Sequence, residues 1–206
     1  AYTKFKTAIG QGPDADAART LFEEARQLFD REKYVAAAEK FQDAADRWPG
    51  SNLQEEAMFM VGEGYFFADK YVDANDAYEA LIKKYSGSKF LDKAIARQWL
   101  IARYWQQKAE QDPEWSVTPI LTDKTRPLFD TQGRALKIYD NIRLNDPTGP
   151  WSDEALMATA SSHFARGRYE DADYHFGILR REYPKSEYQL MAHLLGLQSK
   201  IRKYQG

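Results

Sequence analysis

The sequence has 206 residues, 43% of them hydrophobic, and its formal net charge of −2 argues against the concentrated basic face of a protein that binds DNA or RNA. It contains no cysteine, which excludes disulfides, thiolate metal sites and a cysteine nucleophile. No apolar run approaches the roughly 18 residues of a membrane span. The chain nevertheless has ample apolar material for a core.

The first residues, 1–16, are predicted to form an N-terminal extension. Gly10, Gly12 and Pro13 interrupt any helix there, and Asp14 or Asp16 is expected to cap the helix that follows. The segment lacks the unbroken apolar stretch and the cleavage site of a signal peptide, and it does not begin with Met. We therefore expect a trimmed or mature chain, with any targeting signal or lipid-attachment cysteine upstream of it.

Apolar residues spaced three and four apart then predict a series of helices. These span residues 17–31, 34–48, 53–69, 71–85, 90–110, 131–145, 153–166, 169–183 and 187–204. Pro49 ends the second helix, because proline has no backbone N–H to donate. Ser51 or Asn52 is expected to cap the third helix, and Ser152 the seventh. Gly62 and Gly64 predict a close approach of the partner helix.

The helical pattern stops once, over residues 109–131. This insertion holds Pro113, Pro119 and Pro127 and has no helical period. Its apolar residues are Trp115, Ile120, Leu121 and Phe129. They predict either a contact with a partner or a plug folded into a groove of the same chain, and both alternatives stay open here.

One set of residues recurs along the chain. Tyr169, Ala172, Phe176, Leu179, Pro184 and Ser186 match Tyr34, Ala37, Phe41, Ala44, Pro49 and Ser51, and match Tyr71, Ala74, Tyr78, Leu81, Ser86 and Ser88. A further copy reads Gln132, Ala135, Tyr139, Ile142 and Pro147. Tyr34 precedes Tyr71 by 37 residues, and Gln132 precedes Tyr169 by the same number. Such a period predicts an array of helix pairs.

The array is predicted to be one solenoid domain, residues 17–206. Its repeats cover residues 17–50, 51–87, 88–147 with the insertion, and 148–185, and a capping helix covers 186–204. Leu190, Leu194, Leu197 and Ile201 form the apolar stripe of that last helix. We expect this helix to close the solenoid, because terminal repeats are usually atypical caps.

The helix pairs and their aromatic–alanine–proline signature resemble the tetratricopeptide repeat. The turn Pro-x-Ser and an alanine eight residues after the proline position are further shared features, the alanines being Ala57, Ala94, Ala155 and Ala192. This combination resembles the outer-membrane assembly lipoprotein D family (BamD/YfiO), and the periplasmic CpoB/YbgF-type repeat proteins share it. The resemblance implies an all-α, right-handed superhelix and a scaffold, lipid-anchored on the periplasmic face of the outer membrane, that binds other assembly proteins.

The sequence offers little chemistry. His163 is expected to pack in the core and His175 to lie on the exposed side of its helix; with His193 they form no HExxH or i, i+3 or i+4 pair that would predict a zinc site. The paired carboxylates, such as Asp171 and Asp173, are expected on solvated helix faces. No glycine motif for nucleotides is present in a strand–helix context. We therefore predict no enzyme activity and no cofactor.

The predicted site is the face formed by the first helix of each pair, which is concave in tetratricopeptide arrays. Its candidate residues for binding a protein or peptide are Arg19, Phe22, Arg26, Phe29, Phe59, Met60, Glu63, Phe66, Phe67, Arg97 and Arg103. Aromatic rings beside arginines are typical of peptide-binding surfaces. In the alternative interpretation, these rings pack against the neighbouring first helix, or against residues 1–16 or 109–131.

The leading functional prediction is a non-catalytic scaffold of the outer-membrane assembly lipoprotein type, whose partners are proteins or extended peptides. Three alternatives stay open: a periplasmic adaptor that coordinates cell-envelope enzymes, a cytoplasmic adaptor such as a co-chaperone, and the regulatory half of a longer enzyme.

Overall fold

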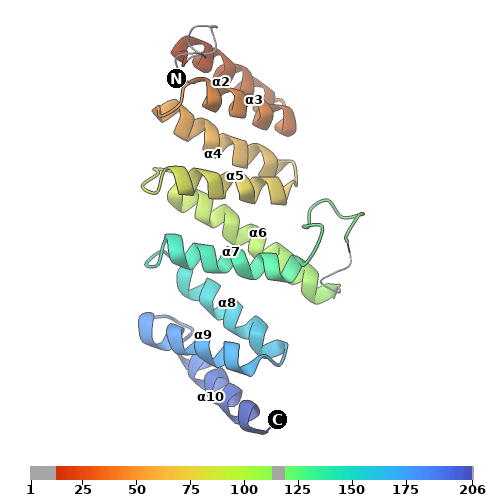
Figure 1. The fold of residues 1–206 in the computed structure, drawn as a ribbon, viewed down its shortest axis with the longest axis vertical. Helices are drawn as coiled ribbons and strands as arrows, with labels where there is room; N and C mark the ends of the chain where they lie inside the picture. The colour runs from red at the N-terminus through yellow and green to blue at the C-terminus, as the bar shows by residue number, and fades with distance from the viewer. Residues whose placement is uncertain (1–12, 113–118, 206) are drawn as a thin grey trace, which may run out of the picture. The chain divides into compact units, whose positions relative to one another are not determined.

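The computed structural model describes residues 13–112 and 119–205, and all the regular secondary structure in these ranges is α-helical (Figure 1). The chain divides into two compact units, the first made of residues 1–97 and 117–129 and the second of residues 98–116 and 130–206. Each unit is a stack of helix pairs, which confirms the predicted all-α fold of tetratricopeptide type. The single solenoid domain stays a prediction. Most of the predicted extension and Trp115 lie outside the described residues.

Within the described residues, the first unit contains four complete helices and the start of a fifth. These are α2 (Ala15–Asp30), α3 (Tyr34–Arg47), α4 (Asn52–Phe67), α5 (Tyr71–Lys84) and the first residues of α6 (Leu91–Gln111). Helix α3 packs against α2 and α4, and α4 packs against α5 and also touches α2. Every boundary lies within two residues of its predicted position. None of the described helices is long and apolar enough to cross a membrane.

Alanines and two phenylalanines make the core of the first pair. Phe22 and Phe41 meet edge to face, with ring centroids 5.1 Å apart, and both rings are buried. Ala37, Ala38 and Ala44 are fully buried along α3. Small side chains on one helix let the rings of the next approach closely, and burial of each phenyl ring contributes about 2–3 kcal/mol.

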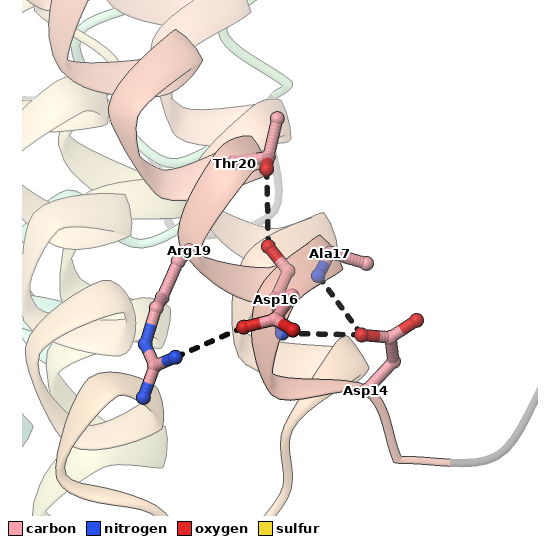
Figure 2. Close-up of polar contacts among 5 residues, drawn as sticks. All are labelled: Asp14, Asp16, Ala17, Arg19 and Thr20. Atoms are coloured by element: carbon pink, nitrogen blue, oxygen red, sulfur yellow. Dashed lines mark hydrogen bonds and ion pairs between the residues drawn. The ribbon is translucent and has the colours of Figure 1, made fainter.

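Asp14 holds the start of α2 (Figure 2). Its carboxylate accepts hydrogen bonds from the backbone N–H groups of Asp16, at 3.1 Å, and Ala17, at 2.9 Å. The hydrogen bond from Ala17 lowers the pKa of Asp14, because it favours the charged carboxylate. Asp16 instead pairs with Arg19 at 3.0 Å. Of the two predicted caps, the structure selects Asp14, and Ser51 is selected in the same way for α4.

The second unit contains the rest of α6 together with α7 (Thr131–Asn145), α8 (Ser152–Ala165), α9 (Tyr169–Glu182) and α10 (Gln189–Gln205). Helices α7, α8, α9 and α10 pack in chain order, and α10 also touches α8. The core around α9 contains Leu156, Phe176 and Leu179, each almost completely buried. The prediction that Ser152 caps α8 is wrong: Ser152 is the first residue of the helix, and its hydroxyl donates to the carbonyl of Asp146.

The apolar stripe of α10 does not face the core. Leu190, Leu194, Leu197 and Ile201 are 82%, 49%, 58% and 47% exposed. The buried residues of this helix are Ala192, Gly196 and Ser199. Small residues and the half-buried Leu195 therefore make the contact with the preceding helices, and the leucines of the stripe point away from it. The predicted C-terminal helix is confirmed, and its apolar stripe is exposed.

The part of the insertion from Pro119 to Asp130 is a short ordered loop. The N–H of Ile120 donates to the carbonyl of Leu128 at 2.8 Å, and the guanidinium of the buried Arg126 lies 3.1 Å from the Asp123 carboxylate. Leu121 and Phe129 are 76% and 45% exposed. Their exposure does not fit the plug interpretation, and the contact with a partner stays a prediction.

Gly62 gives a testable measure of how closely α4 and α5 approach. A Cβ atom built on Gly62 would lie 2.4 Å from Cε1 of the fully buried Tyr78. We expect Gly62→Ala to lower the free energy of unfolding by about 2 kcal/mol, because overpacking exceeds the gain in helix propensity. Urea unfolding followed by circular dichroism measures this. Gly87→Ala is the matched control, since nothing lies within 4 Å of its Cβ position; equal effects of the two substitutions would refute the close contact.

Candidate protein-binding surface

An aromatic cluster lies at the carboxyl ends of α2 and α4 in the first unit. We call it the aromatic–arginine cluster; its members are Phe29, Tyr34, Phe66, Phe67, Tyr71 and Arg97. Phe67 is central to it, with its ring centroid 5.6 Å from that of Phe29, 5.5 Å from Tyr34 and 5.9 Å from Phe66. Phe67 is 45% exposed, and Phe29 and Phe66 are half-buried. The cluster is thus rigidly packed on one side and open on the other.

Arg97 of α6 fixes the position of two of these rings. Its guanidinium lies 4.5 Å from the centroid of the Phe66 ring and 5.3 Å from that of Phe67. The same guanidinium donates two hydrogen bonds to Glu63, from Nε at 2.8 Å and from Nη2 at 2.9 Å. This fork restricts the guanidinium to one plane, which then serves as a platform for the rings.

Glu63 connects the cluster to the core. The Tyr78 hydroxyl donates to its Oε1 at 2.6 Å, so the one carboxylate accepts from both Tyr78 and Arg97. Burial, together with the negative charge of Glu63, raises the pKa of Tyr78 well above its ordinary value. The hydrogen bonds that Arg97 donates to Glu63 raise the pKa of Arg97 in turn, so the guanidinium stays charged. Glu63 is 9% exposed and acts within the fold, not at its surface.

The predicted surface has to be corrected at two aromatic positions. Phe22 and Phe59 are each only 6% exposed. Phe22 packs against Phe41 within the first pair, and Phe59 stacks on Phe90 at 4.6 Å. Both rings belong to the core, and their partners differ from those of the alternative interpretation, since Phe41 and Tyr78 lie on second helices. Met60 is half-buried and packs on the same core as Phe22.

Two predicted arginines lie elsewhere on α2. Arg19 is exposed, pairs with Asp16 and lies 5.2 Å from the centroid of the Trp48 ring. Arg26 is exposed and pairs with Glu23 at 3.3 Å. Both pairs are formed along one helix face, and exposed pairs of this kind contribute little to stability. Neither arginine has a contact with the aromatic–arginine cluster among the interactions of the described residues.

Tyr34 and Tyr71 served as markers of the repeat and were not predicted as surface residues. Each begins a second helix directly after the turn that ends a first helix. That position places their rings beside Phe67 and Phe66, at 5.5 Å in both cases. The signal was phenylalanine near the end of one helix with tyrosine at the start of the next: Phe29 precedes Tyr34, and Phe66 and Phe67 precede Tyr71.

Arg103, the last of the predicted residues, lies in the second unit. Its guanidinium lies 4.8 Å from the centroid of the Trp99 ring and 3.6 Å from the Glu154 carboxylate. It borders a pocket of about 240 Å³ whose lining is Trp99, Arg103, Gln106, Tyr139, Glu154, Met157, Ala158 and Tyr188. Burial raises the pKa of Glu154 and of Tyr139, and the Tyr139 hydroxyl donates to Gln106 at 2.9 Å. The pocket suits one amphipathic side chain of a ligand.

His163 and His175 form a pair that the sequence did not predict. Their rings stack at 5.3 Å between α8 and α9, and His175 is half-buried instead of exposed. The two residues are twelve apart in sequence, so no spacing within one helix could indicate this contact. In the described part of the chain, no group of three or more histidine, aspartate or glutamate side chains could hold a metal ion.

The histidine pair predicts acid sensitivity. Burial lowers the pKa of both rings below the ordinary value of 6.5, and the unfolded chain therefore binds more protons than the folded one just below that pH. The contribution of the neutral histidines to the free energy of unfolding is therefore complete above pH 6.5. It is lost as the pH falls from 6.5 through the lowered pKa of each folded histidine. We expect the urea midpoint to decrease from about pH 7 to about pH 5, and to do so less in His175→Phe. An unchanged pH slope in His175→Phe, with the exposed His193→Gln as control, would contradict this.

Comparison with known proteins identifies the repeats. The tetratricopeptide repeat family matches residues 56–88, which cover most of α4 and all of α5, and residues 154–186, which cover most of α8 and all of α9. A search of curated proteins finds no match to the chain. The chain therefore carries tetratricopeptide repeats, the helix pairs of protein–protein interaction scaffolds.

Proposed function

We propose that this chain is a scaffold that binds an extended segment of a partner protein on the aromatic–arginine cluster. The observation that carries the proposal is Phe67, a large apolar ring that is 45% exposed and held in place by three other rings and Arg97. A rigid exposed ring loses little conformational entropy on binding and is a favourable anchor.

The ligand chemistry follows from the charges around the cluster. Glu63 already takes both forked hydrogen bonds of Arg97, so little of that positive charge is available to an acidic ligand. The exposed Phe67 and the half-buried Phe29 and Tyr34 that contact it offer an aromatic surface. We therefore propose a segment that contributes an aromatic, proline or other apolar side chain to these rings.

We further propose that the scaffold is of the outer-membrane assembly lipoprotein type and works on the periplasmic face of the outer membrane. The repeat subtype supports this. Ala57, Ala94, Ala155 and Ala192 are all completely buried, so the shared alanine spacing reflects a shared packing of the helix pairs. Ser51 caps α4 by accepting from the N–H of Gln54, and Ser88 and Ser186 accept from the N–H groups two residues on.

The first experiment is a pull-down from an envelope extract with the 206-residue chain as bait. We expect barrel-assembly proteins to be captured by the unaltered chain and reduced about tenfold or more with Phe67→Ala, because loss of a central anchor typically costs 1–2 kcal/mol or more. Leu144→Ala is the matched control, since Leu144 is 65% exposed on α7 and lies outside the cluster.

Three outcomes would change the proposal. Capture of wall-synthesis enzymes in place of assembly proteins would move the function to an adaptor of cell-envelope enzymes. Capture of cytoplasmic chaperones would move it to a co-chaperone. Equal capture by the Phe67 and Leu144 variants would reject the aromatic–arginine cluster as the binding surface, whichever partner is recovered.

A further inference from the structure

Helix α10 presents an apolar face that no described residue covers. We call this the α10 face; it consists of Leu190, Leu194, Leu197 and Ile201, which are between 47% and 82% exposed. It borders a groove of about 480 Å³ lined by Arg180, Leu190, His193, Leu194, Leu197 and Lys200. The face lies in the second unit, and its ligand is independent of the function proposed for the first.

The repeat register shows which face of a first helix this is. Ala192 of α10 is equivalent to Ala57 of α4 in the repeat. Residues at equal distances after these two alanines therefore occupy equivalent positions. Phe59 and Leu194 come two residues after these alanines, and Gly62 and Leu197 come five residues after them. Gln54 and Gln189, three residues before the alanines, both donate to carbonyls at the end of the preceding helix. The contact of α10 with α9 therefore repeats the contact of α4 with α3.

In the complete pairs, the same two positions receive an aromatic ring from the second helix. Phe59 faces Tyr78 at 6.1 Å, and the Gly62 position lies directly on the Tyr78 ring. In the first pair, Phe22 holds the equivalent position and packs on Phe41. Phe22 and Phe59 are each 6% exposed, whereas Leu194, at the equivalent position of α10, is 49% exposed. The groove on α10 thus stands where a second helix would lie.

The charged side chains that line the groove, Arg180 and Lys200, are basic; Arg180 pairs with Asp173 at 3.7 Å, and Lys203 farther along α10 pairs with Glu170 at 2.7 Å. Helix α10 contains no aspartate or glutamate among Gln189–Gln205, and Lys200 and Arg202 are exposed and have no ion pair among the described residues. Arg180 of α9 is held at the groove by the bond from its Nη1 to the Ala192 carbonyl at 3.0 Å. A second copy of the chain would bring another basic helix to this edge, and like charges disfavour such pairing.

We propose that the α10 face binds an amphipathic helix of a partner protein, with an aromatic residue in the middle of its apolar stripe and acidic residues along its flank. Such a helix would lie on α10 as α5 lies on α4, with its aromatic ring over Leu194 and Leu197. The acidic residues would face Lys200 and His193. This is helix-in-groove recognition, built from the packing that the chain already uses between its own helices.

The probe is a capped, fluorescent peptide of residues Tyr34–Arg47, because this helix carries Phe41 between buried alanines and has the acidic residues Glu39, Asp43 and Asp46. We expect its fluorescence anisotropy to rise on titration with the full chain. A peptide with Phe41→Ala should bind at least tenfold more weakly. Leu190→Asp and Leu194→Asp in the chain should reduce binding to the same extent, and Leu144→Asp should leave it unchanged.

Leu190 is 82% exposed, so Leu190→Asp is expected to fold even if Leu194→Asp does not. The proposal is overturned if the peptide does not bind, or binds equally to the chain and to Leu190→Asp. It is also overturned if the α10 face instead drives dimerisation in sedimentation velocity or binding to phosphatidylglycerol vesicles, with either effect lost in Leu190→Asp. Phe67→Ala should not affect peptide binding, so this test and that of the aromatic–arginine cluster fail separately.

Discussion

Replacing Arg97 by alanine is expected to lower the free energy of unfolding of the first unit by about 3 kcal/mol, because it leaves the carboxylate of Glu63 buried without its cation. The Glu63 side chain is 11% exposed and that of Arg97 29%, so water can compensate only part of the loss. Urea unfolding followed by circular dichroism gives the free energy. The tryptophan signal is a second probe of the same transition.

A triple variant separates the charge effect from simple loss of packing. Glu63→Leu, Tyr78→Phe and Arg97→Leu together remove every polar group of the network. Because no charge or hydroxyl is then left without a partner, the triple variant should be more stable than Arg97→Ala alone. A triple variant that is less stable than Arg97→Ala would show that the hydrogen bonds and the ion pair of the network add net stability to the fold, in addition to offsetting the cost of burying the charges.

The second large effect is expected at Phe22. Phe22→Ala should cost about 3–4 kcal/mol, since it opens a cavity beside the fully buried Phe41. Phe29→Ala should cost less, about 1–2 kcal/mol, because Phe29 is half-buried; it packs at the edge of the core and contacts Tyr34 and Phe67.

For partner binding, the order of the two effects is expected to reverse. Phe29→Ala should weaken capture of the partner, since Phe29 supports the Phe67 ring, whereas Phe22→Ala should leave capture unchanged at a temperature where it is still folded. The readouts are thermal unfolding and pull-down from the same preparations. If Phe22→Ala weakened capture more than Phe29→Ala at equal folded fraction, the assignment of Phe22 to the core alone would fail.

The helices were predictable from the sequence because each follows the same local rules. Apolar residues at helical spacing, a proline or serine at the turn, and a repeat of 37 residues placed every boundary within two residues. Alanine at the tightest contacts, such as Ala37 and Ala57, also indicated the packing, since both are fully buried. Such information is contained in short segments of the chain.

The binding surface was less predictable, because a first helix has more than one apolar face. Phe22 and Phe29 are seven residues apart and share a stripe, yet Phe22 packs on the second helix and Phe29 meets the next repeat at Phe67. Helical spacing alone does not distinguish these faces. The contacts of Arg97 with Glu63 and of His163 with His175 join different helices, so only the folded arrangement shows them.

Site-specific photo-crosslinking measures whether Phe67 anchors a partner protein. A photoreactive phenylalanine analogue is placed at position 67, and separately at the exposed position 144 of α7, before incubation with the envelope extract. We predict a crosslinked barrel-assembly protein from position 67 and none from position 144. Equal crosslinking from both positions, or crosslinking from position 144 only, would show that Phe67 is not the anchor.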